Sequence, residues 1–206
     1  MHRRKKYDVR YLTQLALLVA VEMVMKTIGL GSVPVGPLYM SFLTVPIAVG
    51  AIILGPMAGM ILGGVFGFVS FLDAIKGASV MTSNLLAVSP VHTFVLCFVM
   101  RVLMGLCVGL VYLAMTKVCK KHMVNCFAAS LSAPLLNTLF FMGYIVLAFY
   151  DTPYIQGLAA ARGAANPLMF VALLVGIQGV VEAVVCSIAG TAVAGGVRRA
   201  LGRTAR

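Results

Sequence analysis

Most of this chain consists of long apolar segments separated by short connections, and this pattern restricts the fold more than any other feature. Hydrophobic residues make up 62% of the 206 residues and charged residues only 10%, whereas roughly 25% of the residues of a soluble domain are charged. A membrane helix needs roughly 20 apolar residues. The chain therefore predicts an all-α integral membrane protein with six transmembrane helices, at about residues 11–28, 40–54, 56–73, 91–115, 125–150 and 167–193.

Basic residues flank these segments and produce the net charge of +11. They gather in residues 1–10, 116–124 and 196–206, while the connections on the other side carry Lys76 and Arg162. Cytoplasmic connections carry the excess of Lys and Arg, so we expect both termini in the cytoplasm. The predicted parts are a basic cytoplasmic tail (1–10), a six-helix membrane domain (11–195) and a second basic cytoplasmic tail (196–206). Because no basic face is interleaved with aromatic residues, nucleic acid is not an expected partner.

Catalytic motifs are absent from the sequence. It has no GxxxxGK[ST] phosphate loop, no HExxH and no GxSxG. The five acidic residues are dispersed, and the five cysteines show no CxxC spacing. We predict that the chain is not an enzyme, and we expect no catalytic residue, cofactor or metal site.

Charged residues inside apolar segments are the strongest functional signal. Arg101 lies about ten residues into its segment, where a charge costs roughly 2.5–3.5 kcal/mol on insertion scales. It needs a ligand, a polar cavity or a structural partner such as Glu22 or Glu182. Lys26 lies near the outer end of the first segment, where it could snorkel or sit at the mouth of a site. Two cations with few nearby acids would suit an anionic or carboxylate-bearing ligand.

Polar residues in the outer half of the membrane form a second group. Gln178 and Glu182 are four residues apart and share a helix face. They and Asn137 could form interhelical hydrogen bonds or line a cavity. Our candidate substrate contacts are Lys26, Tyr39, Asn84, His92, Arg101, Asn137 and Gln178.

Glycines repeat at helical spacing in two segments. Gly59, Gly63 and Gly67 share one helix face, and Gly105 and Gly109 share another. Small residues let membrane helices approach closely. We predict that these five glycines serve helix packing.

Several short motifs occur in an order typical of one family. They are Ala16-x-x-x-Ala20, Val45-Pro46, Leu54-Gly55-Pro56, Ser89-Pro90, Arg101-Val-Leu-x-Gly105 and Asn137-Thr-Leu-Phe140. Over about residues 11–193 the chain resembles the substrate-binding S component of energy-coupling factor (ECF) vitamin transporters, which are prokaryotic plasma-membrane importers. The pattern is most similar to the pantothenate-type members, although Met100 stands where a proline is expected.

The resemblance implies a binding subunit that captures a small water-soluble vitamin outside and delivers it inward. Pantothenate is favoured, through charge-assisted bonds from Arg101 or Lys26 to its carboxylate, and riboflavin or another vitamin remains open. Ala16 and Ala20 would dock on the transmembrane coupling subunit, and two separate ATPase subunits would hydrolyse ATP. The loop Gly29–Tyr39 would form a gate over the site, with Gly31, Pro34, Gly36 and Pro37 as its gating residues.

Two other functions stay open. A stand-alone secondary transporter or channel would show inverted repeats and coupling-ion carboxylates inside its spans. The sequence has no clear repeat, and Glu22 and Glu182 are its candidate intramembrane acids. A membrane enzyme or scaffold would use Arg101 in a structural ion pair and bind no ligand there.

Overall fold

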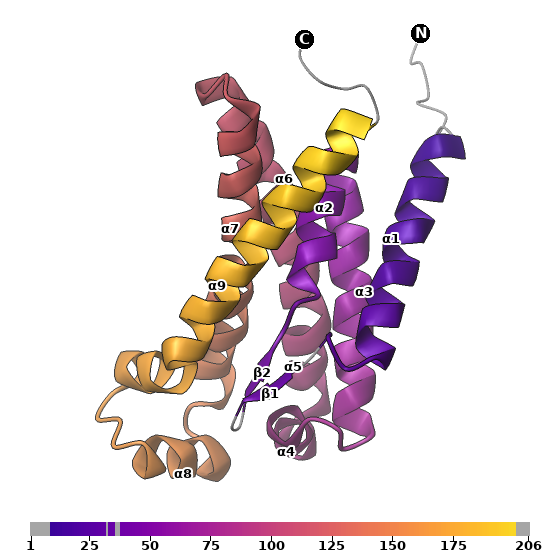
Figure 1. The fold of residues 1–206 in the computed structure, drawn as a ribbon. Coiled ribbons are helices and arrows are strands. Elements are labelled where there is room, and N and C mark those ends of the chain that lie inside the picture. Colours follow the sequence, from indigo (N-terminus) through magenta and orange to yellow (C-terminus); the bar gives the residue numbers. More distant parts are fainter. Residues whose placement is uncertain (1–8, 32, 36–37, 201–206) are drawn as a thin grey trace, which may run out of the picture.

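The computed structural model describes residues 9–31, 33–35 and 38–200, with side chains described outside 32–40. The chain forms a bundle of helices with one small hairpin (Figure 1). The helices are α1 (Val9–Thr27), α2 (Thr44–Leu54), α3 (Pro56–Ile75), α4 (Val80–Val88), α5 (Pro90–Phe94), the π-helical segment η1 (Val95–Val99), α6 (Met100–Val118), α7 (His122–Phe149), α8 (Pro153–Ala161) and α9 (Pro167–Ala200). The strands are β1 (Val33–Val35) and β2 (Leu38–Met40).

Each of the six predicted segments coincides with a helix, and four helices in the described part are long and apolar enough to cross a membrane. These four run over Pro56–Ile75, Pro90–Val118, His122–Phe149 and Pro167–Ala200. The 11 residues of α2 span about 16 Å, which is short of the roughly 30 Å hydrocarbon core. Eight of these residues are buried, and α2 packs against α1, α3, α6, α7 and α9. The protein is therefore multi-pass and largely helical, while six complete crossings remain a prediction.

Three connections between the predicted segments contain regular structure. The loop at residues 29–39 carries part of the antiparallel hairpin β1–β2, in which Val33 pairs with Met40. The connection between the third and fourth predicted segments contains the helix α4, in which Met81 and Leu85 lie four residues apart and are buried together against the bundle. The connection before the last segment likewise contains α8, whose Ile155 and Ala159 are buried at the same spacing.

Glycines bring α3 and α6 into close contact, as predicted. A Cβ atom added to Gly59 would lie 2.3 Å from the carbonyl oxygen of Gly105, and one added to Gly63 would lie 2.2 Å from the carbonyl oxygen of Arg101. These separations leave no room for a side chain. The glycine face of α3 therefore fixes the backbone that carries Arg101.

Two of the long helical segments are interrupted. The π-helical segment η1 ends at Val99, two residues before Arg101 in α6, and π-helical turns are frequent at functional sites. In α9, Gly176 has φ +42° and ψ −137°, so α9 consists of two helices joined at a kink. Both interruptions lie next to the cavity described below.

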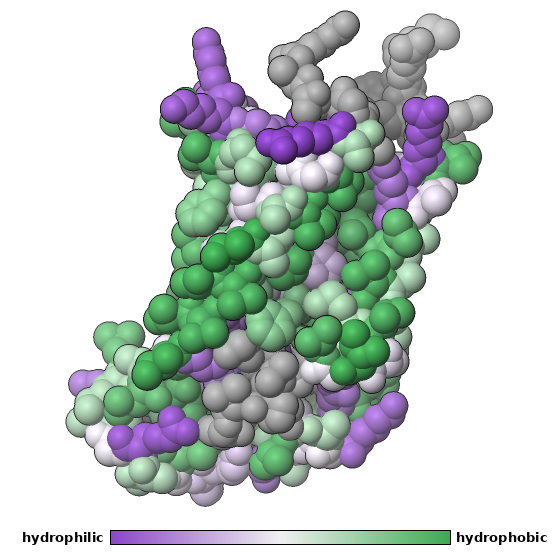
Figure 2. Space-filling view, in the orientation of Figure 1, coloured by the Kyte–Doolittle hydropathy of each residue, from purple (hydrophilic) through white to green (hydrophobic). Residues whose placement is uncertain are grey.

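The two ends of the bundle differ in character. Figure 1 shows α1 beginning and α9 ending at one end, with the hairpin, α4 and α8 at the other. Hydrophilic side chains gather at the first end, and apolar side chains cover the flank between the two ends (Figure 2). Large apolar residues on this outer surface, including Leu139, Leu147 and Ile177, are more than half exposed. An exposed apolar flank between polar ends is what a bilayer requires.

Candidate functional site

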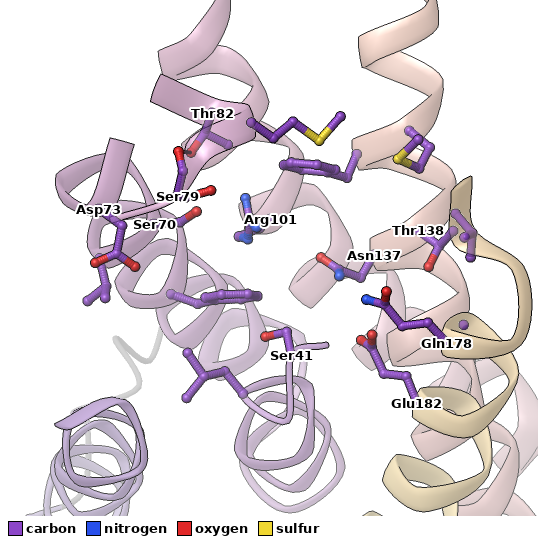
Figure 3. A pocket seen from close by; sticks show the side chains of 18 of the residues that line it. Ser41, Ser70, Asp73, Ser79, Thr82, Arg101, Asn137, Thr138, Gln178 and Glu182 are labelled. Atoms are coloured by element: carbon purple, nitrogen blue, oxygen red, sulfur yellow. Dashed lines mark hydrogen bonds between the residues drawn. The ribbon is translucent and has the colours of Figure 1, made fainter. Parts of the chain in front are cut away.

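A cavity of about 140 Å³ lies inside the bundle, toward the end with the hairpin and α4. Residues from α1, α3, α4, α6, α7 and α9 line it, together with the segment that follows the hairpin. Phe66, Phe141, Met142 and Val175 contribute apolar surface. Its polar lining consists of Lys26, Ser41, Ser70, Asp73, Ser79, Thr82, Arg101, Asn137, Thr138, Gln178 and Glu182 (Figure 3).

Arg101 points into this cavity and is 8% exposed. Its guanidinium carbon lies 4.2 Å from the ring centroid of Phe66 and 4.9 Å from that of Phe141. One terminal nitrogen donates to the Cys97 carbonyl at 3.1 Å, and Nε has no hydrogen-bond partner among the described residues. Aromatic faces thus support the cation and leave a buried donor unused.

The acid partners considered for Arg101 do not form an ion pair with it in the described part of the chain. Glu22 is buried on α1 with neither carboxylate oxygen bonded to a described residue, and it does not line the cavity. Glu182 lines the cavity and attracts Arg101 electrostatically, but no ion pair joins them. Within the described residues, Arg101 is therefore held by aromatic faces and a backbone carbonyl rather than by an ion pair.

Lys26 at the end of α1 forms an ion pair with Asp73 near the end of α3. The side chains are 24% and 19% exposed, respectively. The expectation of few nearby acids was therefore wrong, because Asp73 and Glu182 both line the cavity. Asp73 neutralises Lys26, so Arg101 is the cation best placed to receive an anionic ligand group.

The α7 and α9 wall of the cavity presents hydrogen-bonding groups. Gln178 and Glu182 project together from α9, just after the kink at Gly176 (Figure 3). Glu182 is 5% exposed and accepts a backbone hydrogen bond from Ser41. Its Oε1 and the Oδ1 of Asn137 have no donor among the described residues.

The structure brings four of the seven predicted contacts to the cavity. Lys26, Arg101, Asn137 and Gln178 all line it. Asn84 and His92 are not among its lining residues. Their proposed contact with substrate stays a prediction, as does that of Tyr39, whose side chain lies outside the described residues.

Asn84 and His92 instead make contacts within the bundle. The amide of Asn84 donates to the Val80 carbonyl at 2.8 Å. Burial raises the pKa of Tyr154 on α8, and a hydrogen bond with Asn84 lowers it. His92 Nδ1 and the Tyr144 hydroxyl are 2.8 Å apart.

The predicted gating residues are partly described. Gly31 is buried, and its carbonyl accepts a hydrogen bond from the Ser41 hydroxyl at 3.3 Å. Pro34 lies in β1. Gly36 and Pro37 lie outside the described residues.

Several lining residues were not among the predicted contacts. Phe66, Ser70 and Asp73 follow helical spacing along α3, so a search for polar residues on one face could have found the last two. Thr138 adjoins Asn137, and Ser41 directly follows the hairpin. No sequence signal distinguished Phe66 and Phe141 from other apolar residues.

Comparison with known proteins identifies a family. A family model described as "ECF transporter, substrate-specific component" matches residues 10–193, which include all of α2 to α8 and most of α1 and α9. No match was found among curated proteins. Substrate-specific components bind the transported molecule and are not themselves enzymes. Since the match covers nearly the whole membrane domain, the chain belongs to the family of substrate-specific components of ECF transporters.

Proposed function

We propose that this chain is the vitamin-binding subunit of an ECF importer in a prokaryotic plasma membrane. It captures a small water-soluble, carboxylate-bearing vitamin outside, with pantothenate favoured, and delivers it inward. A transmembrane coupling subunit and two ATPase subunits supply the energy. Six membrane crossings with both termini in the cytoplasm complete the proposal.

The observation that carries the substrate class is the buried Arg101, which has no ion-pair partner among the described residues. A carboxylate accepting from its Nε would form a charge-assisted hydrogen bond, which is roughly twice as strong as a neutral one. Pantothenate also carries an amide and two hydroxyl groups, which suit the polar walls around Asn137 and Gln178. Riboflavin lacks a carboxylate, and the guanidinium of Arg101 covers the faces of Phe66 and Phe141 that a flavin ring would need.

Capture from outside is supported by the position of the cavity along the bundle. Basic residues lie in the last turns of α6 and α9 or directly after α6, at the end of the bundle opposite the hairpin: Lys117, Lys120, Lys121, Arg198 and Arg199. The positive-inside rule places that end in the cytoplasm. The cavity, the hairpin and α4 then lie toward the outer surface, where substrate arrives.

A gating role for the loop at residues 29–39 is supported by contacts at its base. The Gly31 amide donates to the Met25 carbonyl at 2.8 Å, and the Ser41 hydroxyl donates to the Gly31 carbonyl. Both loop ends therefore lie at the cavity, whose lining includes Ser41 and Leu43.

Docking on the coupling subunit through α1 is supported by its place in the bundle. This helix lies at the edge of the bundle, against α2 and α3 (Figure 1). Ala16 and Ala20 are both exposed and lie four residues apart. They form a shallow strip that another helix could approach closely.

The test is a ligand panel on the purified chain in detergent. Pantothenate, riboflavin, folate, biotin and thiamine are each added, and the thermal unfolding temperature is measured. A ligand at 100 times its dissociation constant stabilises the folded state by about 2.7 kcal/mol. We expect a shift with pantothenate that Arg101→Gln reduces while unliganded unfolding stays cooperative. No shift with any vitamin would contradict the proposal.

A stand-alone secondary transporter is the second candidate, because two acidic residues are buried inside helices. Glu22 and Glu182 lie in α1 and α9, and α9 is broken next to the cavity. Broken helices and buried acids are features of secondary transporters. Proteoliposomes containing the chain alone would distinguish the two: uptake driven by an ion gradient without ATPase subunits would favour this candidate.

A further inference from the structure

Three buried polar groups around the cavity lack partners among the described residues, and their chemistry differs from one side to the other. Arg101 Nε on α6 is a donor without an acceptor. Asn137 Oδ1 on α7 and Glu182 Oε1 on α9 are acceptors without donors. Figure 3 shows Asn137 and Glu182 on the helices facing Arg101. An unsatisfied buried group is costly, so the occupant of the cavity must complement this pattern.

Glu182 lines the cavity together with Ser41, from the segment that follows the hairpin. One of its oxygens accepts the backbone hydrogen bond from Ser41, and the Ser41 hydroxyl bonds the Gly31 carbonyl at the loop base. The second oxygen, Oε1, remains without a donor among the described residues. Glu182 therefore has one buried oxygen that can accept a hydrogen bond from another group.

We infer that the ligand binds in one orientation, with an anionic group at Arg101 and hydrogen-bond donors at Asn137 and Glu182. This inference rests on the proposed function and adds to it the class of ligand and the role of Glu182. The ligand is an acid whose other end carries hydroxyl or amide N–H groups. Glu182 determines specificity, because its carboxylate accepts hydrogen bonds from donors at that end of the ligand.

The same carboxylate excludes a second class of ligand. A molecule with an acid at both ends would place one anion against Glu182, and like charges in a buried site repel strongly. Specificity often comes from such a repulsive contact as much as from attractive ones. Arg101 and Glu182 together thus select monoacids over diacids.

The test pairs two variants with chemically edited ligands. The variants are Arg101→Gln and Glu182→Gln; glutamine at 182 can still accept the Ser41 hydrogen bond. The ligands are pantothenate, its alcohol analogue without the carboxylate, and an analogue whose two hydroxyl groups are replaced by hydrogen. Dissociation constants are measured by calorimetry, and Gln156→Ala on α8, outside the cavity, serves as the control variant.

We expect either edit to weaken binding to the unmodified chain by about 10- to 100-fold, since hydrogen bonds to charged groups are lost. In Arg101→Gln, removing the carboxylate should cost no more than a few-fold, while removing the hydroxyls keeps its full effect. In Glu182→Gln, removing the hydroxyls should cost no more than a few-fold, while removing the carboxylate keeps its full effect. Such coupling between one residue and one ligand group is what a double-mutant cycle measures.

Three results would overturn the inference. Coupling of Arg101 to the hydroxyls and of Glu182 to the carboxylate would reverse the orientation. Equal effects of both edits in all variants would show that neither side chain contacts these groups. A vitamin without an anionic group as the strongest ligand would refute the acid class while leaving the proposed function standing. If no vitamin binds at all, the proposed function itself fails.

Discussion

The guanidinium carbon of Arg101 lies 4.2 Å from the ring centroid of Phe66 and 4.9 Å from the ring centroid of Phe141. Phe66 belongs to α3 and Phe141 to α7, so two neighbouring helices hold the cation that α6 supplies. A cation–π contact contributes about 2 kcal/mol or more when it is desolvated. The cavity thus carries a buried charge without an ion-pair partner in the described part of the chain.

Replacing Arg101 by lysine should weaken pantothenate binding by about tenfold or more, although the charge is kept. Lysine cannot offer the planar guanidinium that lies between Phe66 and Phe141, nor the donor at Nε. Calorimetric titration of the purified variant measures this change. Binding equal to that of the unmodified chain would show that charge alone is recognised.

Replacing Gly63 by alanine should destabilise the bundle by roughly 1–3 kcal/mol, the usual cost of overpacking. The added Cβ would lie 2.2 Å from the Arg101 carbonyl oxygen, so α3 and α6 must separate. Ligand binding should fall as well, because the backbone that carries Arg101 moves. Thermal unfolding with and without ligand measures both effects.

Gly143→Ala on α7 is the matched control for this prediction. A Cβ at that position meets no atom within 4 Å, and alanine favours a helix over glycine by roughly 1 kcal/mol. Gly143→Ala should therefore be neutral or stabilising. Equal destabilisation by both variants would contradict the role assigned to the α3–α6 contact.

Replacing Asp73 by asparagine removes the ion pair with Lys26 and should destabilise the chain by at most about 1 kcal/mol, because both side chains are partly exposed. The lining of the cavity then carries one negative charge fewer. We expect anionic ligands to bind the variant several-fold more tightly, with this gain declining as salt is raised. An unchanged affinity for anions would show that the charge of Lys26 does not reach the ligand.

The helices and their packing were predictable from the sequence, because apolar segment length and glycine spacing are local signals. Each of the six segments contains a helix, and the glycine face of α3 packs on α6 as expected. The helix α4 was not predicted, because polar residues lie between Met81 and Leu85 and the segment was taken as a connection. A connection that contains several polar residues can still form a helix when apolar residues four apart share one face.

The cavity was predictable only in part. A charge inside an apolar segment identified Arg101 as a candidate, and the spacing of four residues placed Gln178 and Glu182 on one helix face; all three line the cavity. The partner of Lys26 was not foreseen, because Asp73 lies 47 residues away and the pairing depends on how α1 and α3 meet. The rings around Arg101 were equally hidden, since a phenylalanine in an apolar segment gives no sign of the cation it contacts.

Replacing Ala20 by leucine should abolish uptake by the assembled transporter and leave vitamin binding to the isolated chain unchanged. Ala20 is exposed on α1, away from the cavity, so the larger side chain meets a partner helix rather than the ligand. Ala16→Leu should act in the same way, because the two residues share a face. Transport of radiolabelled vitamin into cells that express the complete complex measures the loss.

The control for this prediction is Val91→Leu on α5, which enlarges a side chain that is 72% exposed on another element. It should leave both uptake and binding intact. Co-purification with the coupling subunit then tests why uptake is lost. If this face of α1 docks on the coupling subunit, Ala20→Leu should weaken the complex between the two proteins. An intact complex that fails to transport, or an equal loss of ligand binding, would show that this face of α1 does not dock on the partner.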